Sequence, residues 1–257
     1  MNSKKLIRKL YKKFPKKIAK KYHDYVGVMV NCLKEESNKI VLCLDVTDKV
    51  IQEAINFNAD LIISHHPFFY GSRAEILRFD EDKKRMYDTL LNHHIAVYSF
   101  HTNFDEGKDG MNDALLEALG LINIEPIPLI PMGRQGELPE EMNIDDFAHY
   151  AVEKLNLDYA QLIKGDKEKI KKVGIIGGSG SRSAPLALKQ GIDIFLSGDT
   201  PYHIRRLLQD QHLNYLHVDH EIEVIFCQQM KKILLSFDKD LQILPVNDVK
   251  QIELITR

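Results

Sequence analysis

Short apolar runs alternate with helical patterns along the first half of the chain, and this alternation constrains the fold more than any other feature. The runs IVLCLD, LIIS and IAVYSF, which begin at Ile40, Leu61 and Ile95, are typical of buried strands. Between them, residues 47–56 and 82–92 carry apolar side chains at helical spacing. Strands separated by helices of this length pair in parallel through right-handed crossovers. The sequence therefore predicts an α/β fold.

The second half repeats this rhythm after a proline-rich stretch, IEPIPLIPMG, at residues 124–133. A helix is expected over 144–155, followed by the strand-like runs VGIIGG, IDIFLS, NYLHV and LQILP. We expect the proline-rich stretch to separate two α/β lobes with mostly parallel sheets, 1–125 and 126–257. The C-terminal part of the second lobe is expected to return to a shared site.

Composition places the chain among ordinary globular proteins. Its 257 residues are 44% hydrophobic and 28% charged, with a formal net charge of -2, which excludes disorder and a chain that is basic throughout. The three cysteines, Cys32, Cys43 and Cys227, form no CxxC pair and indicate reduced thiols in a cytoplasmic protein. No secretion signal or membrane span is expected.

Positive charge is concentrated at the N-terminus. Ten basic residues occupy this segment: Lys4, Lys5, Arg8, Lys9, Lys12, Lys13, Lys16, Lys17, Lys20 and Lys21. They could form an arm for nucleic acid or membrane. We favour an amphipathic surface helix, because Leu6, Leu10 and Phe14 recur at helical spacing and leave the basic side chains on the solvent side. Neither nucleic acid nor membrane is an expected partner.

Polar clusters follow three of the strand-like runs. HHP begins at His65, HTNFD spans 101–105 and VDHEIE spans 218–223. Adjacent histidines alone are commonly solvated residues at a strand end. However, a set of polar or glycine residues recurs at predicted carboxyl ends, where open α/β sheets bind ligands: Asp45, His65, His66, His101, Asp105, Gly178, Asp199 and His220.

The side chains in these clusters suit a metal centre. They offer imidazole nitrogen and carboxylate oxygen but no thiolate, which favours zinc, manganese, iron(II) or cobalt. The candidate ligands are His65, His66, His101, Asp105, His220 and Glu223. An open catalytic zinc site uses three protein ligands, so this set indicates two divalent ions per chain, roughly 3.5–4 Å apart.

Two further features have competing interpretations. The glycine-rich turn at 177–181 could present backbone N–H groups to an anion or serve only as a tight turn. Asp199 could orient a ligand histidine or cap the helix that follows it.

Two blocks of sequence resemble the NIF-three-like family, also described as GTP cyclohydrolase 1 type 2 or dinuclear metal center proteins. LCLDVTDKVIQEAINFNADLIISHHPFFYG and SFHTNFDEGKDGMNDALLEALGL are similar to two characteristic family blocks. FPKKIAKKYHDYVG is less similar to a segment in which the family often has a Trp-Asp pair. The resemblance covers nearly the whole chain.

The resemblance implies a fold and a ligand set. The fold is two interlinked α/β lobes forming a toroidal homohexamer, with the metal site at strand carboxyl ends between the lobes. The implied metal ligands are His65, His66, Asp105, a C-terminal histidine and a nearby glutamate, with His101 close to the ions. The alignment selects His220 with Glu223, and leaves Asp219 or Glu221 as alternative registers because VDHEIE departs from the family pattern.

Two functional hypotheses follow. The first is a metal-dependent hydrolase acting on a nucleotide or another phosphorylated small molecule, with a GTP cyclohydrolase as a special case. The second is a non-enzymatic metal-binding assembly or regulatory protein. An open coordination position would distinguish a catalytic ion from a structural one.

Overall fold

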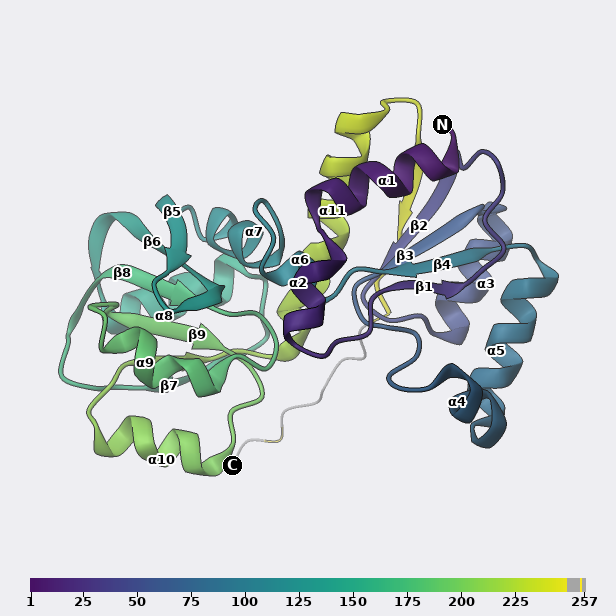
Figure 1. The fold of residues 1–257 in the computed structure, drawn as a ribbon. Coiled ribbons are helices and arrows are strands. Elements are labelled where there is room, and N and C mark those ends of the chain that lie inside the picture. Colours follow the sequence, from purple (N-terminus) through teal and green to yellow (C-terminus); the bar gives the residue numbers. More distant parts are fainter. Residues whose placement is uncertain (249–254, 256–257) are drawn as a thin grey trace. The chain divides into compact units, whose positions relative to one another are not determined.

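The computed structural model describes residues 1–248 and Ile255, and it divides the chain into two compact units (Figure 1). The first unit combines Met1–Asn103 with Phe226–Arg257, and the second is Phe104–Ile225. The second unit is therefore inserted into the sequence of the first. Each unit has its own sheet, which confirms the mixed α/β fold.

The sheet of the first unit is mostly parallel. Its strand order is β1-β4-β3-β2-β11, and all pairs are parallel except β1 with β4. The strands are β1 (Gly27–Val30), β2 (Lys39–Cys43), β3 (Leu61–Ser64), β4 (Ala96–Ser99) and β11 (Gln242–Pro245). The apolar runs predicted as β2, β3 and β4 are confirmed, and their parallel pairing brings three carboxyl ends to one edge.

Helices cover both faces of this sheet. They are α1 (Ser3–Lys13), α2 (Lys16–Lys21), α3 (Asp48–Phe57), α4 (Arg73–Phe79), α5 (Glu81–Asn92) and α11 (Ile225–Phe237). Helix α3 begins where the Thr47 hydroxyl accepts the Val50 N–H, a normal N-cap. Its Ile51 shares one hydrophobic cluster with Ile62 of β3 and Leu90 of α5.

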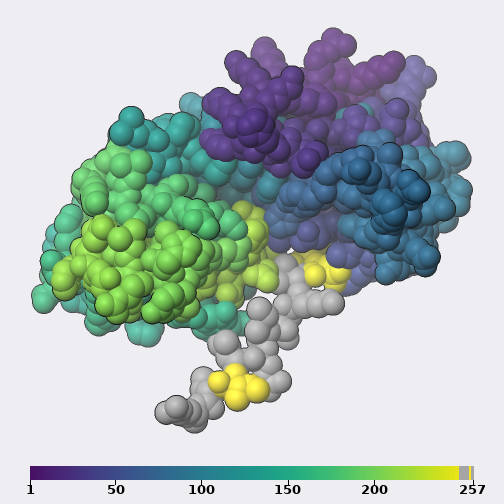
Figure 2. All heavy atoms as spheres, turned by 60° about the horizontal axis from the view of Figure 1, so that its bottom comes forward, coloured from purple at the N-terminus to yellow at the C-terminus, as the bar shows by residue number. Residues whose placement is uncertain are grey.

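The basic N-terminal segment forms an amphipathic helix, as predicted. Leu6, Leu10 and Phe14 are fully buried, whereas Lys5 and Lys12 are exposed. Figure 2 shows these first residues, coloured purple, at the surface of their unit. Burial of one apolar stripe therefore accounts for the position of the lysines on the opposite side.

The sheet of the second unit has a parallel centre with antiparallel strands around it. Its order is β5-β6-β8-β9-β10-β7, in which β8, β9 and β10 are parallel and the other pairs antiparallel. The strands are β5 (Ile122–Ile127), β6 (Ile130–Asn143), β7 (Gln161–Ile163), β8 (Lys169–Ile175), β9 (Ile194–Ser197) and β10 (Tyr215–His217).

Short helices connect these strands. They are α6 (Thr102–Asp105), α7 (Met111–Ala118), α8 (Ile144–Lys154), α9 (Ala184–Leu188), α10 (Tyr202–Asp210) and the 3-10 helices η1 (Ser181–Ser183) and η2 (His220–Val224). Asn143 caps α8 by accepting the Asp145 N–H, as its position before the helix indicates. No helix in residues 1–248 is long and apolar enough to cross a membrane.

The proline-rich stretch does not separate the units. It forms the hairpin of β5 and β6 inside the second unit, with Ile122 paired to Glu137 and Glu125 to Gln135. Hydrogen bonding between the two strands thus joins residues on both sides of the expected division at residue 125. Pro126 is tolerated because β5 is an edge strand.

A buried ion pair ties this hairpin to the helix beside it. The Arg134 side chain is 5% exposed, and its Nε donates to Asp113 Oδ1 of α7 at 2.9 Å. Its terminal nitrogens donate to the carbonyl oxygens of Pro131, Gly133 and Glu106. The guanidinium is therefore both charge-paired and well supplied with acceptors, which a buried cation requires.

We expect Arg134→Met to lower the free energy of unfolding by about 3–5 kcal/mol, because it leaves the buried Asp113 carboxylate without its charge partner. The matched control is Arg85→Met, which removes an exposed pair with Asp48 and should cost less than about 1 kcal/mol. Urea denaturation measures both. Equal effects would contradict the assigned role of Arg134.

Candidate metal centre

Three histidines gather at the carboxyl edge of the first unit's sheet. His65 and His66 directly follow β3, and His101 lies two residues after β4 ends at Ser99. The His65 and His66 N–H groups continue the ladder by donating to the carbonyls of Cys43 and Leu44. One ring nitrogen from each of the three histidines lies within 4.8 Å of the others, close enough to hold one ion.

Each of these rings is oriented by a hydrogen bond at Nδ1. His65 Nδ1 donates to the Phe100 carbonyl at 2.9 Å, and His66 Nδ1 donates to Asp45 at 2.8 Å. His101 Nδ1 donates to Asp24 at 2.8 Å. Because a carbonyl or carboxylate oxygen can only accept, the proton of each neutral ring is on Nδ1 and the lone pair is on Nε2. This is the tautomer and support that metal-binding histidines use.

Asp24 is a functional candidate that the sequence analysis did not single out. Its side chain is 8% exposed and also accepts from the Thr102 N–H and hydroxyl, at 3.2 and 2.6 Å. Burial acts to raise the pKa of Asp24, but the hydrogen bonds from His101 and Thr102 outweigh it and lower the pKa below its usual value. Asp24 is therefore held as an anion behind His101. The one sequence signal for Asp24 was the weak resemblance of the segment that contains HDYVG to the family segment with a Trp-Asp pair.

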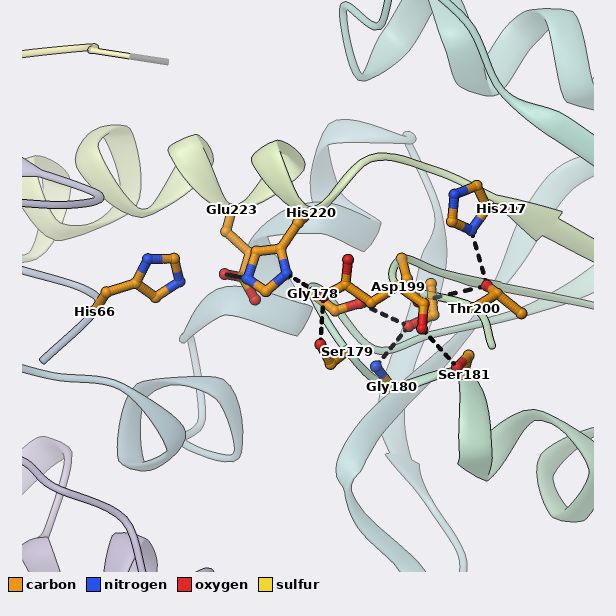
Figure 3. A network of polar contacts seen from close by, with 12 residues as sticks. His66, Gly178, Ser179, Gly180, Ser181, Asp199, Thr200, His217, His220 and Glu223 are labelled. Atoms are coloured by element: carbon orange, nitrogen blue, oxygen red, sulfur yellow. Dashed lines mark hydrogen bonds and ion pairs between the residues drawn. The ribbon is translucent and has the colours of Figure 1, made fainter. Parts of the chain in front are cut away.

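A second group of candidate ligands lies in the second unit. His220 and Glu223 come from η2, and His220 Nε2 lies 3.0 Å from Glu223 Oε2 (Figure 3). A carboxylate oxygen of Asp105 lies within 4.8 Å of one from Glu223. The expected i,i+3 contact is thus present, although a 3-10 turn precedes the predicted helix. Asp219 instead accepts from the Tyr159 hydroxyl at 2.7 Å.

Asp199 orients His220 in the same way as the carboxylates of the first unit orient their histidines. His220 Nδ1 donates to Asp199 Oδ2 at 2.6 Å, and the Ser179 hydroxyl donates to the same oxygen at 2.5 Å. The alternative interpretation of Asp199 as a helix cap is wrong, because the N-cap of α10 is Pro201.

The same contacts change the proton affinity of His220. The hydrogen bond with Glu223 raises the pKa of His220 to about 9, burial opposes this shift, and Asp199 reinforces it. In the metal-free chain His220 is therefore a cation between two carboxylates near neutral pH.

The glycine-rich turn makes room for these two side chains. Gly178 has φ +59°, and a Cβ there would lie 2.4 Å from Glu223 Oε1 and 3.1 Å from His220 Cε1. Its neighbour Gly177 donates its N–H to Asn112 Oδ1 at 2.7 Å. Asn112 in turn donates to the Asp105 carbonyl at 3.2 Å. The turn therefore allows the candidate ligands Glu223 and His220 to pack closely against the backbone. Sequence reasoning did not identify Asn112.

The six sequence-predicted ligands are thus divided into two sets by unit: His65, His66 and His101 belong to the first unit, and Asp105, His220 and Glu223 to the second. Both sets offer imidazole or carboxylate groups. The cysteines belong to neither, since Cys43 and Cys227 are buried free thiols of the first unit. The donor chemistry therefore fits a divalent transition metal.

Known proteins match this chain over most of its length. Residues 1–250 match the family model Duf34/NIF3 (NGG1p interacting factor 3). A "GTP cyclohydrolase 1 type 2 homolog" of Clostridium perfringens is 37% identical over 207 residues, covering 77% of each chain. NGG1-interacting factor 3 of Saccharomyces cerevisiae is 27% identical over 225 residues, covering 77% of this chain and 78% of its own.

A solved structure shares the fold. The crystal structure of a Bacillus cereus protein related to NIF3 has a TM-score of 0.86 and 22% identity, covering 100% of this chain and 99% of its own.

We expect Gly178→Ala to weaken metal binding and to lower stability. Alanine in a left-handed conformation costs about 1–2 kcal/mol, and its Cβ would also displace Glu223. Gly191→Ala is the matched control, because Gly191 has φ +89° but no atom within 4 Å of an added Cβ. Urea denaturation and metal titration of both variants provide the comparison, and indistinguishable variants would contradict the assigned role of the turn.

Stability of the metal-free protein should depend on pH through His220. Because the pKa of His220 rises from 6.5 to about 9 on folding, its stabilising effect is fully present below pH 6.5 and is lost as pH rises through about 9. The difference in unfolding free energy between wild type and His220→Asn should shrink over this range. Denaturation of metal-depleted protein at several pH values measures it, and a difference that grows with pH would be the contrary result.

Proposed function

Because the chain belongs to the Duf34/NIF3 family, we propose that it is a dinuclear metal-dependent hydrolase acting on a nucleotide or another phosphorylated small molecule. One observation carries the proposal. All four candidate histidines donate Nδ1–H to an oxygen acceptor, which makes Nε2 the ring atom that would bind a metal. Solvated surface histidines do not require a hydrogen bond at Nδ1 that fixes the orientation of the ring.

The proposed ligands are His65, His66, His101, Asp105, His220 and Glu223. We propose, as the family resemblance implies, that both sets bind the ions of the dinuclear centre.

The number of ligands supports two ions per chain, since an open catalytic zinc ion takes three from the protein. Zinc, manganese or iron(II) suits the mixture of imidazole and carboxylate. Such ions, when bound, lower the pKa of a bound water and polarise a phosphoryl or carbonyl oxygen.

The chain's own residues prepare the site for this chemistry. Asp24, Asp45 and Asp199 hold the imidazole rings and increase their basicity as ligands. His220 must lose the proton that it shares with Glu223 before its Nε2 can bind a metal. Metal binding at this position therefore competes with protonation of His220.

The substrate class rests on the metal chemistry and on the names of the relatives. Two-metal sites are suited to phosphoryl and carbonyl substrates, and the Clostridium relative is named for GTP cyclohydrolase 1 type 2. GTP is therefore one candidate among nucleotides.

A non-enzymatic role is the second candidate. The name of the yeast relative refers to interaction with NGG1, which favours a metal-binding assembly or regulatory protein. The two functions differ in coordination, because a catalytic ion keeps a position for water or substrate and a structural ion does not.

Assembly and location complete the proposal. We propose a cytoplasmic protein that forms a homohexamer, the assembly that the family resemblance implies. The free thiols Cys32, Cys43 and Cys227 support a reducing compartment. Light scattering should give a mass about six times the 29.6 kDa of one chain, and a monomer would contradict the assembly.

We expect the loaded protein to bind two divalent ions per chain, and Asp199→Asn to weaken metal binding about 10- to 100-fold by removing the support of His220. Asp48→Asn is the control, because Asp48 is an exposed partner of Arg85 and contacts no candidate ligand. Elemental analysis and metal titration measure both effects. Absence of bound metal after loading with zinc, manganese and iron(II) would refute the metal centre.

Hydrolysis is tested separately with GTP, other nucleotides and phosphodiesters in the presence of manganese or zinc. Turnover that His65→Ala abolishes, with folding retained by circular dichroism, supports the enzyme. Stoichiometric metal binding without turnover of any substrate favours the assembly function.

A further inference from the structure

A fifth histidine, His217, is held in the same way as the candidate metal ligands but is not one of them. It is the last residue of β10 and is half-buried, and its Nδ1 lies 2.8 Å from the Thr200 hydroxyl (Figure 3). Among the described residues, no group of candidate ligands with atoms within 4.8 Å of one another includes His217. The support of its ring therefore needs an explanation other than metal binding.

A chain of hydrogen bonds determines which nitrogen of His217 carries the proton. The Tyr215 hydroxyl donates its one proton to the Ser197 carbonyl at 2.8 Å, because a carbonyl can only accept. The Thr200 hydroxyl, 2.7 Å from the Tyr215 oxygen, therefore donates to that oxygen and accepts from His217 Nδ1. The Gly198 carbonyl, 3.5 Å from Thr200 Oγ1, is too distant to compete. Nδ1 of the neutral ring thus has the proton, and Nε2 has the lone pair.

The sheet fixes this hydrogen-bond chain away from water. Tyr215 and Ser197 are fully buried, and Ser197 is the register partner of His217 in the neighbouring strand β9. Nε2 of His217, in contrast, makes no hydrogen bond within the described residues. The fold therefore selects one tautomer and leaves Nε2 as a proton acceptor for a bound molecule.

Neighbouring residues of one turn hold His217 and the candidate ligand His220. Asp199 accepts from His220 Nδ1 at 2.6 Å, and the next residue, Thr200, accepts from His217. Figure 3 shows Asp199 beside His220 and Thr200 beside His217. The turn follows the carboxyl end of β9 and His217 ends β10, so both rings lie at the edge where open α/β sheets bind ligands.

The charges around His217 suit a ring that changes its protonation state. Burial has the largest effect and lowers the pKa of His217 below its usual value, and Arg205 acts in the same direction. Asp219 and Asp199 act to raise the pKa of His217. The ring is therefore neutral near neutral pH, and the two carboxylates stabilise the cation that forms when Nε2 accepts a proton.

We propose that His217 transfers the proton in the hydrolysis proposed above, on which this inference rests. Nε2 accepts a proton from the attacking water while the water oxygen forms a bond to the phosphorus or carbonyl carbon of the substrate. The imidazolium then gives that proton to the leaving oxygen or nitrogen as the bond to it breaks. Proton transfer by a positioned histidine contributes about 10²- to 10⁴-fold to the rate. Thr200 acts through His217 and is a positioning residue.

The first test measures steady-state turnover by metal-loaded protein of the substrate that the hydrolysis panel identifies. His217→Gln should lower kcat about 100-fold or more, with the KM and metal content of wild type. His212→Gln is the matched control and should leave kcat unchanged, because this exposed histidine precedes the amino end of β10.

The outcomes separate this inference from the proposed function. Wild-type turnover that His217→Gln leaves unchanged would refute the role of His217 and keep the hydrolase. Loss of bound metal in His217→Gln would also refute it, because His217 would then be a ligand. Absence of turnover by wild type would refute the hydrolase, and this inference would fall with it.

A second experiment tests the hydrogen-bond chain without turnover. Nitrogen NMR spectroscopy of the histidine side chains in zinc-loaded protein reports which ring nitrogen is protonated. Wild type and Thr200→Ser, which keeps the hydroxyl, should have His217 protonated at Nδ1. Thr200→Val should shift the proton towards Nε2, and should lower kcat without changing KM. Protonation of His217 at Nε2 in wild type would overturn the assigned tautomer and the proposal.

Discussion

The candidate metal centre depends on one repeated interaction, the hydrogen bond from histidine Nδ1 to an oxygen. Imidazole can present either nitrogen, and its ring turns freely unless a partner holds it. The Phe100 carbonyl and the carboxylates of Asp45, Asp24 and Asp199 supply that partner at four positions. Because each acceptor is itself placed by a strand end or an adjoining loop, the two sheets determine which nitrogen each ring offers.

Burial of Glu223 imposes a second constraint. This carboxylate is only 3% exposed, so it needs a cation or several donors to remain charged. In the metal-free chain His220 provides the cation, and Asp199 stabilises that charge from the other side of the ring. Gly178 is required at the same point because the carboxylate approaches the backbone where a Cβ would lie. Electrostatics and packing therefore act on the same few atoms.

The first unit gathers its candidate ligands at one edge of its sheet. At the carboxyl ends of β3 and β4 it brings together imidazoles, which are ligands for cations. Parallel strands produce this arrangement, because all of their carboxyl ends lie at the same edge.

Sequence alone determined the parallel strands, the amphipathic first helix and the identity of the candidate ligands, because periodic burial and strand ends leave local patterns such as LIIS followed by His65 and His66. It could not identify Asp24 or Asn112, since their roles depend on partners distant in the chain, His101 for one and Gly177 for the other. It also misassigned the stretch at 124–133, where pairing of β5 with β6 outweighed the local signal of proline. Local patterns record which side chains are buried, whereas only the tertiary structure decides which of them meet, because those contacts join residues that no sequence period relates.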